Sequence, residues 1–205
     1  MSEVEKTTLE LIHQAAREEF LDKGFKSASL RNIVKKAGVT TGAFYGYYES
    51  KEALFEALVG RHYQFIMDCY RKAQSDFAGL PPEQQPENMG EISGGCMLEM
   101  LLYAYDNLED FKMLLCCAQG TRFEGMIDEM VDIEIKSTHD YQAVLESLGR
   151  PSKEIDPKLE HILVTGMFGA FFELIIHEMP VEQAKIYLEE LREFYTAGWL
   201  KIMGQ

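Results

Sequence analysis

The chain has 205 residues, of which 46% are apolar, and its formal net charge at pH 7 is −14. This is enough apolar sequence to bury a sizeable core, either in one large domain or in a small domain joined to a larger one. The most apolar stretch, Ile162 to Phe172, is too short to span a bilayer, and the N-terminus lacks the basic and apolar regions of a secretory signal. We therefore expect a cytoplasmic protein without a membrane segment.

The cysteine pattern agrees with this location. No two cysteines have the CxxC spacing, and the adjacent pair Cys116 and Cys117 cannot readily form a disulfide with each other. We interpret all four cysteines as small buried hydrophobic residues and leave a thiol sensor as the alternative. We predict no metal site and no cofactor.

The charge is distributed unevenly along the chain. Between Lys23 and Lys51 there are six basic residues and one acid, Glu49, so this segment carries +5 and the remainder carries −19. Binding to phosphate requires a basic footprint, which the whole chain lacks but this segment provides. The distribution predicts one short basic surface on an otherwise acidic protein.

The first predicted helix has apolar residues at steps of three and four positions: Leu9, Ile12, Ala16 and Phe20. Thr7 or Thr8 can cap its start, and Gly24 followed by Phe25 is a plausible end. A second helix, about nine residues long, follows Ser29 and ends at Gly38.

Two further helices follow at once. Thr40 can cap a third helix that runs through Tyr47, and Ser50 can cap a fourth that carries Glu52 in its first turn, where the helix dipole favours an acid. The proline-rich stretch 79–90 predicts a loop.

Later helices are expected at about 92–105, 108–118, 122–148, 157–177 and 181–203. Pro157 suits the first turn of its helix, with Asp156 as the cap. No strand-like alternation of useful length is present. The predicted fold class is therefore all-α.

The second and third helices match a helix-turn-helix, because both are short and AGVT separates them. Helical spacing places Phe44 and Tyr48 on the face toward the core, whereas Tyr45 and Tyr47 point outward. An exposed phenol can contact a phosphate, and so can threonine hydroxyls and the amides at a helix N-terminus. The segment therefore predicts DNA binding.

The run SLRNIVKKAGVTTGAFYGYYESKEALFEAL resembles the DNA-binding domain of the tetracycline-repressor (TetR) family over about the first quarter of the chain. The shared features are a tyrosine, an aromatic residue two or three positions later, and a Lys-Glu pair with a leucine beyond. Gly46 stands where the family often has a bulkier residue. The resemblance implies that the DNA-binding residues are Arg31, Thr41, Gly42, Ala43, Tyr45, Tyr47 and Lys51. The hydroxyl of Thr40 is a further candidate contact.

The helix at 157–177 carries small residues at steps of three and four positions, which would let another helix approach closely. The TetR resemblance implies a homodimer joined through the last two long helices, and a dimer suits an operator with two half-sites. The predicted interface consists of Gly166, Gly169, Ala170, Glu173, Leu191 and Trp199.

Segments rich in Met, Cys and aromatic residues occupy 96–105, 111–118 and 125–131. Such side chains can line a lipophilic pocket or simply form the core. The resemblance implies a pocket for a small, lipophilic effector. The predicted lining is Met100, Tyr103, Phe111, Leu115, Cys116 and Phe168.

No catalytic pattern stands out. The acids between Asp128 and Glu134 are typical of a solvated helix face, and His139, His161 and His177 lack HExxH-type spacing. We predict that the protein is not an enzyme but a transcriptional repressor, with a DNA-binding domain at 1–51 and an effector-binding and dimerisation domain at 52–205. A helical-bundle enzyme and a DNA-binding scaffold without a ligand are the alternatives.

Overall fold

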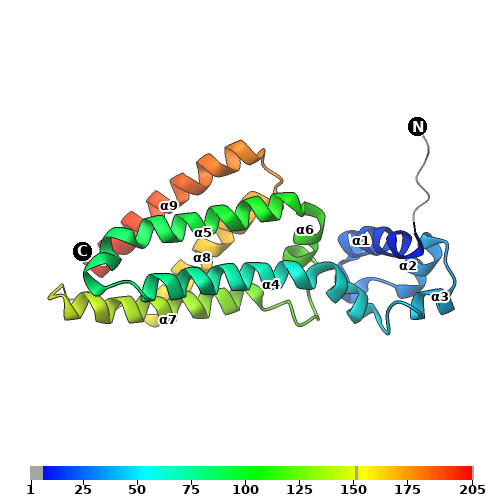
Figure 1. Cartoon of the computed structure of the whole chain (residues 1–205), viewed down its shortest axis with the longest axis horizontal. Coiled ribbons are helices and arrows are strands. Elements are labelled where there is room, and N and C mark those ends of the chain that lie inside the picture. The colour runs from blue at the N-terminus through cyan, green and yellow to red at the C-terminus, as the bar shows by residue number, and fades with distance from the viewer. Residues whose placement is uncertain (1–6, 151, 205) are drawn as a thin grey trace. The chain divides into compact units, whose positions relative to one another are not determined.

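The computed structural model describes residues 7–150 and 152–204. The first six residues, part of the N-terminus in which we expect no secretory signal, lie outside this range. Over the described residues the chain forms helices and no strand, which confirms the all-α class (Figure 1). The helices are α1 (Thr8–Ser27), α2 (Leu30–Ala37), α3 (Thr41–Tyr45), α4 (Lys51–Ala78), the 3₁₀ turn η1 (Pro82–Gln84), α5 (Gln85–Asp106), α6 (Leu108–Cys116), α7 (Met126–Ser147), α8 (Pro157–Ile176) and α9 (Val181–Met203).

The chain divides into two compact units. The first unit comprises Met1–Gln64 and Asn107–Glu124, and so contains α1 to α3, the start of α4, and α6. The second unit comprises Phe65–Asp106 and Gly125–Gln205, and contains the rest of α4 with α5, α7, α8 and α9. The domain boundary after residue 51 stays a prediction.

The start of α1 is fixed as its sequence predicts. The Thr7 hydroxyl accepts a hydrogen bond from the backbone N–H of Glu10, while the Glu10 carboxylate accepts one from the backbone N–H of Thr7 at 2.7 Å. This reciprocal pair satisfies two backbone donors that a helix start leaves unpaired. Gly24 then interrupts the helix with φ +70°, which is a conformation that favours glycine.

Aromatic residues form the core of the first unit. The Phe55 ring lies 5.0 Å from that of Phe20 and 5.2 Å from that of Phe25, both in edge-to-face arrangements. Phe44 of α3 is also fully buried. These rings, from α1, α3 and α4, hold the short helices in place, because helices of five and eight residues are too short to be stable alone.

Two helix starts in the rest of the chain differ from expectation. Helix α5 begins at Gln85 inside the predicted loop, since Pro86 occupies the first turn, where its missing N–H has no helical partner to lose. Helix α7 begins at Met126 instead of residue 122, after a turn in which Thr121 bonds Ala118 and Phe123. Helices α8 and α9 begin at Pro157 and Val181 as predicted.

The four cysteines form no disulfide and have different surroundings. Cys96 and Cys117 are buried, Cys69 is partly buried, and Cys116 is exposed, so its predicted burial is wrong. Cys116 is the last residue of α6, where the helix side chain faces solvent. The Sγ atoms of Cys69 and Cys96 lie 3.7 Å apart.

Helix α8 provides much of the core of the second unit. Its buried residues include Val164, Phe168, Phe171, Phe172 and Ile175. By length and composition alone, α8 is the one helix among the described residues that could cross a membrane. The core helix of a soluble protein passes the same test, and α8 packs against α7 and α9.

Candidate DNA-binding surface and ligand cavity

Helices α2 and α3 and the turn between them form a helix-turn-helix. Gly38 ends α2 in the left-handed conformation at φ +68°, and the Thr40 hydroxyl caps α3 by accepting the Ala43 N–H at 3.1 Å. Helix α3 ends at Tyr45 and not at Tyr47. From Gly46 the chain continues as a hydrogen-bonded turn, in which the N–H groups of Tyr47 and Tyr48 bond the carbonyl of Phe44.

The aromatic residues of this segment separate as the helical spacing predicts. Phe44 is fully buried, whereas Tyr45 and Tyr47 are 54% and 50% exposed. Tyr48 is partly buried, and its hydroxyl hydrogen-bonds His13 at 2.5 Å. Burial raises the pKa of Tyr48 and lowers that of His13. Two tyrosines therefore remain available on the surface.

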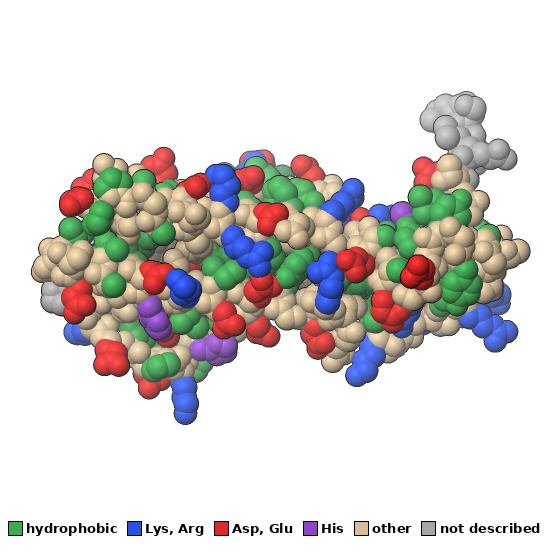
Figure 2. All heavy atoms as spheres, turned by 60° about the horizontal axis from the view of Figure 1, so that its bottom comes forward, with side chains coloured by type: hydrophobic (Ala, Val, Ile, Leu, Met, Phe, Trp, Pro, Cys, Tyr) green, Lys and Arg blue, Asp and Glu red, His purple; other side chains and the backbone are tan. Residues whose placement is uncertain are grey.

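Other predicted DNA contacts lie on the surface as well. Arg31, Thr40, Thr41 and Gly42 are exposed, while Ala43 is partly buried. Lys and Arg side chains project from the first unit in the view of Figure 2. Hydroxyls, phenols and cations of this kind can contact the backbone and base edges of DNA.

Lys51 has an internal role that the sequence did not indicate. Its ammonium group donates to the carbonyls of Phe25 at 2.7 Å and Ala28 at 3.0 Å, and it lies 4.4 Å from the centre of the Phe25 ring. Lys51 thus fastens the end of α1 to the start of α4. Two of its three N–H groups are used in this way.

An ion pair joins α1 to α6 within the first unit. Arg17 donates to both carboxylate oxygens of Asp110, at 2.5 and 2.8 Å, and the fully buried His62 lies 3.5 Å from the same carboxylate. Burial alone would raise the pKa of Asp110, but the bonds from Arg17 and His62 outweigh it and hold the pKa at about 2. Asp110 is therefore a charged anchor for α6.

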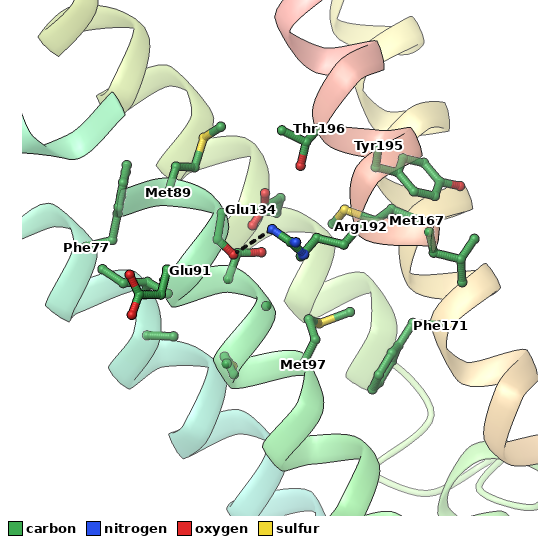
Figure 3. Close-up of a pocket in the computed structure, with 18 of the residues that line it drawn as sticks. Phe77, Met89, Glu91, Met97, Glu134, Met167, Phe171, Arg192, Tyr195 and Thr196 are labelled. Carbon is green, nitrogen blue, oxygen red and sulfur yellow. Dashed lines mark hydrogen bonds between the residues drawn. The ribbon is translucent and has the colours of Figure 1, made fainter. Parts of the chain in front are cut away.

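The second unit contains a cavity of about 610 Å³, which is within the usual size range for small-molecule sites. Figure 3 shows side chains from several helices pointing into it. Most of its wall is apolar, and its larger apolar residues include Phe77, Met89, Met97, Met167, Phe168, Phe171, Leu188, Leu191 and Trp199.

Of the six residues predicted to line a pocket, only Phe168 lines this cavity. Met100 is fully buried, and Tyr103 stacks on Phe65 with ring centres 3.6 Å apart. The other three, Phe111, Leu115 and Cys116, belong to α6 in the first unit. Composition alone cannot distinguish a cavity wall from a core, because both use the same side chains.

One wall of the cavity is polar. Glu134 of α7 accepts hydrogen bonds at Oε2 from the Tyr70 hydroxyl and from Gln74 Nε2, the latter at 2.7 Å. Ser137 in turn donates to Gln74 Oε1 at 2.5 Å. The acidic face predicted on α7 is therefore divided, since Asp128 and Asp132 are exposed and Glu134 lines the cavity.

Arg192 of α9 reaches across the cavity toward α5. It binds the carboxylate of Glu189 through Nε at 2.9 Å and through Nη2, and its Nη1 lies 3.4 Å from the Gly90 carbonyl (Figure 3). A Cβ atom on Gly94 would lie 2.9 Å from Arg192 Cδ, and one on Gly90 would lie 3.0 Å from Nη1. The glycines of α5 thus make room for this side chain.

Four of the six residues predicted for the dimer interface are at least partly exposed on α8, and the other two line the cavity. Gly166 and Glu173 are exposed, and Gly169 and Ala170 are partly buried, but Leu191 and Trp199 line the cavity. The long α9 presents different faces to the cavity and to solvent. Large apolar side chains exposed on α8 and α9 are Leu159 (45%), Ile162 (64%), Ile186 (59%) and Phe194 (70%).

Together these features define a helix-turn-helix protein whose second helical unit contains a small-molecule-sized cavity. Residues 12–58 match the family described as bacterial regulatory proteins, tetR family. This segment is a TetR-family DNA-binding domain, as the sequence resemblance implied.

The sequence similarity to curated proteins covers between about a fifth and a third of the chain. The HTH-type transcriptional repressor BepR of Brucella suis biovar 1 (strain 1330) is 41% identical over 54 residues, which are 26% of this chain and 26% of BepR. The chain spans about a quarter of the length of the curated relatives it matches.

Solved structures share the fold over nearly the whole chain. SCO3833, a TetR-family regulator from Streptomyces coelicolor A3, has a TM-score of 0.57 at 15% identity, covering 95% of this chain and 92% of its own. FadR from Bacillus subtilis, solved in complex with stearoyl-CoA, has a TM-score of 0.53 at 14% identity, covering 92% and 97%. These proteins and BepR are described as transcriptional regulators and not as enzymes.

Proposed function

We propose that this protein is a homodimeric repressor that leaves its operator when a small lipophilic molecule binds in the cavity of the second unit. The observation that carries the proposal is the TetR-family helix-turn-helix, which presents Thr41, Tyr45 and Tyr47 on its surface. The cavity is the second support, because its size and apolar wall suit a small lipophilic molecule.

The homodimer is supported by the exposed apolar side chains of α8 and α9. Ile162 and Phe194 are 64% and 70% exposed, and an interface formed by these two helices would bury both side chains. A two-fold dimer would present two recognition helices to the two halves of an operator. Such a protein would work in the cytoplasm, where its DNA is.

Release from DNA requires the ligand to bind the non-operator conformation more tightly than the operator-bound one. A typical coupling of about 1–3 kcal/mol corresponds to roughly 5–150-fold in operator affinity. By reciprocity, operator DNA must weaken ligand binding by the same factor. A DNA-binding scaffold without a ligand would show no such coupling, and the cavity favours the ligand-responsive repressor.

The test has two stages. Genomic fragments retained by the purified protein are sequenced to find the operator, and affinity for that operator is then measured for the parent and for Tyr47→Ala. Tyr187→Ala, a tyrosine substitution on α9, is the matched control. We expect Tyr47→Ala to weaken binding and Tyr187→Ala to leave it unchanged. Absence of any retained fragment would refute the proposal.

A thermal shift screen of lipophilic compounds tests the ligand. A molecule that binds only the folded state must raise the unfolding midpoint. Any hit is then titrated by calorimetry with and without operator DNA. Equal affinities in the two titrations would reject release by that compound.

A further inference from the structure

The carboxylate of Glu134 is the starting point, because it lies in the wall of a mostly apolar cavity. The partners of this carboxylate in the described part of the chain are the Tyr70 hydroxyl and the Gln74 amide, both of which are neutral groups. Both bonds end at Oε2, so Oε1 keeps its capacity to accept. Burial raises the pKa of Tyr70, and so does the nearby Glu134 carboxylate, so this phenol stays a neutral donor.

The cations of the cavity do not compensate Glu134. Arg192 is held by two bonds to Glu189, and Lys185 binds Glu182 at 2.7 Å, so each cation has an acid partner on its own helix. The charge balance within the cavity therefore favours a positive group near Glu134.

A second acid lies near this wall. Glu160 of α8 is 1% exposed, and its Oε2 pairs with His139 Nε2 at 2.9 Å. Its other carboxylate oxygen, Oε1, has no hydrogen-bond partner among the described residues. Burial raises the pKa of Glu134, the bonds from Tyr70 and Gln74 lower it, and the charge of Glu160 raises it further. Glu134 is partly buried, and a cation placed beside its carboxylate would favour the charged form.

We propose that the cavity takes a lipophilic cation, whose protonated amine binds Oε1 of Glu134 while its apolar body packs on the aromatic and methionine side chains of the cavity. Phe77, Phe171 and Met97 lie around the same space as Glu134 (Figure 3). The inference rests on the proposed function only in assigning this cavity to the effector. The claim about binding itself is independent of DNA.

An anionic amphiphile is the main rival, since Arg192 also lines the cavity. To meet it with an uncompensated charge, Arg192 would have to release Glu189, whose carboxylate already neutralises the guanidinium in a two-point contact. Such contacts between a guanidinium and a carboxylate are among the stronger hydrogen bonds in proteins. No comparable cost applies to an amine at Glu134, because no cation has to be displaced there.

The experiment compares three probes with one alkyl chain: decylamine, decanol and decanoate. Each is titrated by calorimetry at pH 7.5, below its micelle-forming concentration, into the full-length protein without DNA. We expect decylamine to bind most tightly and decanoate most weakly. This comparison uses the unaltered protein, so it needs no variant to fold.

Glu134→Gln should then weaken decylamine binding by about tenfold or more, the size expected for a lost charge-assisted hydrogen bond. Binding of decanol should stay within about twofold. Glu91→Gln is the matched control, because it removes the same charge from an exposed position on the cavity lining, and it should leave decylamine within about twofold. Circular dichroism checks that both variants are folded.

Equal affinities for decylamine and decanol would overturn the proposal, and so would an unchanged decylamine affinity in Glu134→Gln. Tightest binding by decanoate, lost in Arg192→Gln, would place an anion site at Arg192 instead. If the amine binds through Glu134 but the protein retains no DNA, the proposed function fails and this inference stands. If the protein binds DNA but does not bind the amine, this inference fails and the proposed DNA-binding function stands.

Discussion

Lys51 shows how one side chain can serve both the fold and the surface. Its two bonds to backbone carbonyls connect the end of α1 with the start of α4, and the same ammonium is predicted to contact a DNA phosphate. The two roles are compatible, because one N–H remains. A substitution can separate the two roles, because the bonds to the carbonyls stabilise the fold without DNA, whereas the phosphate contact affects only DNA binding.

We expect Lys51→Ala to lower the free energy of unfolding by about 1–3 kcal/mol, because it leaves two carbonyls without their charged donor. If Lys51 also contacts a phosphate, binding to all DNA sequences should weaken alike and the salt slope should fall by roughly one. Urea denaturation and a salt series measure the two effects. Lys51→Met, which keeps most of the apolar stem, is the control. A loss of stability with an unchanged salt slope would mean that Lys51 is purely structural.

Asp110 makes the stability of the first unit depend on pH. Its pKa of about 2 lies below the ordinary value of 3.8, so its contribution is fully present above about pH 4 and is lost as the pH falls toward 2. A difference of this size corresponds to about 2 kcal/mol. In urea denaturation from pH 6 to pH 2, the parent should lose this much more stability than Asp110→Asn. Parallel curves for the two proteins would contradict the assignment.

At the scale of elements, helix α3 is predicted to read the operator sequence. Substitutions at Thr41 or Ala43 should change the preferred operator, at roughly 1–3 kcal/mol for each altered base pair. Tyr45→Phe is the contrast: as a predicted phosphate contact, it should weaken binding without changing the preferred site. Selection on randomised DNA measures both. Recovery of the parental site by the Thr41 and Ala43 variants would place the recognition residues elsewhere.

Local signals determined which helices could be predicted. Thr7, Gly38, Thr40 and Asp156 cap or end their helices through contacts within a few residues, so the sequence was sufficient there. The sequence predicts a start of α5 at about residue 92, which is too late. The prolines before it indicate a loop, but Pro86 lies in the first turn of the helix. A proline in the first turn of a helix and a proline that breaks a helix cannot be distinguished by propensity unless the start of the helix is known.

The DNA-binding surface could be predicted from local sequence, whereas the cavity could not. The outward direction of Tyr45 and Tyr47 follows from a spacing of three and four residues, and the exposure of both side chains confirms it, although Tyr47 lies beyond the end of α3. The cavity follows from contacts between helices distant in sequence. Glu134 and Arg192 lie 58 positions apart in sequence, and no local pattern relates them. The sequence pattern groups Glu134 with Asp128 and Asp132, which do lie on a solvated helix face.

At the scale of the whole molecule, the predicted dimer can be tested at Gly169. Apart from its chain neighbours and the backbone of its own helix, no described atom lies within 4 Å of the position that a Cβ atom would take there, so a side chain can start from this position without a clash in the single chain. Gly169→Leu should therefore leave the protomer folded and disturb the interface, at a typical overpacking cost of about 1–3 kcal/mol. Sedimentation should show monomer at concentrations where the parent is a dimer, with Gly169→Ala as the control. A dimeric Gly169→Leu would move the interface to another surface.

The glycines that admit Arg192 have a further consequence for α5, which carries Gly90, Gly94 and Gly95 within six residues. Each glycine makes a helix less stable than alanine does by about 1 kcal/mol. The first half of α5 should therefore open by local unfolding more often than α7 or α8, and its amide hydrogens should exchange with deuterium faster. A ligand that fills the cavity should slow that exchange. The ligand would then enter the cavity through its least stable wall, the first half of α5. The rate of local unfolding of this segment would limit the rate of ligand binding.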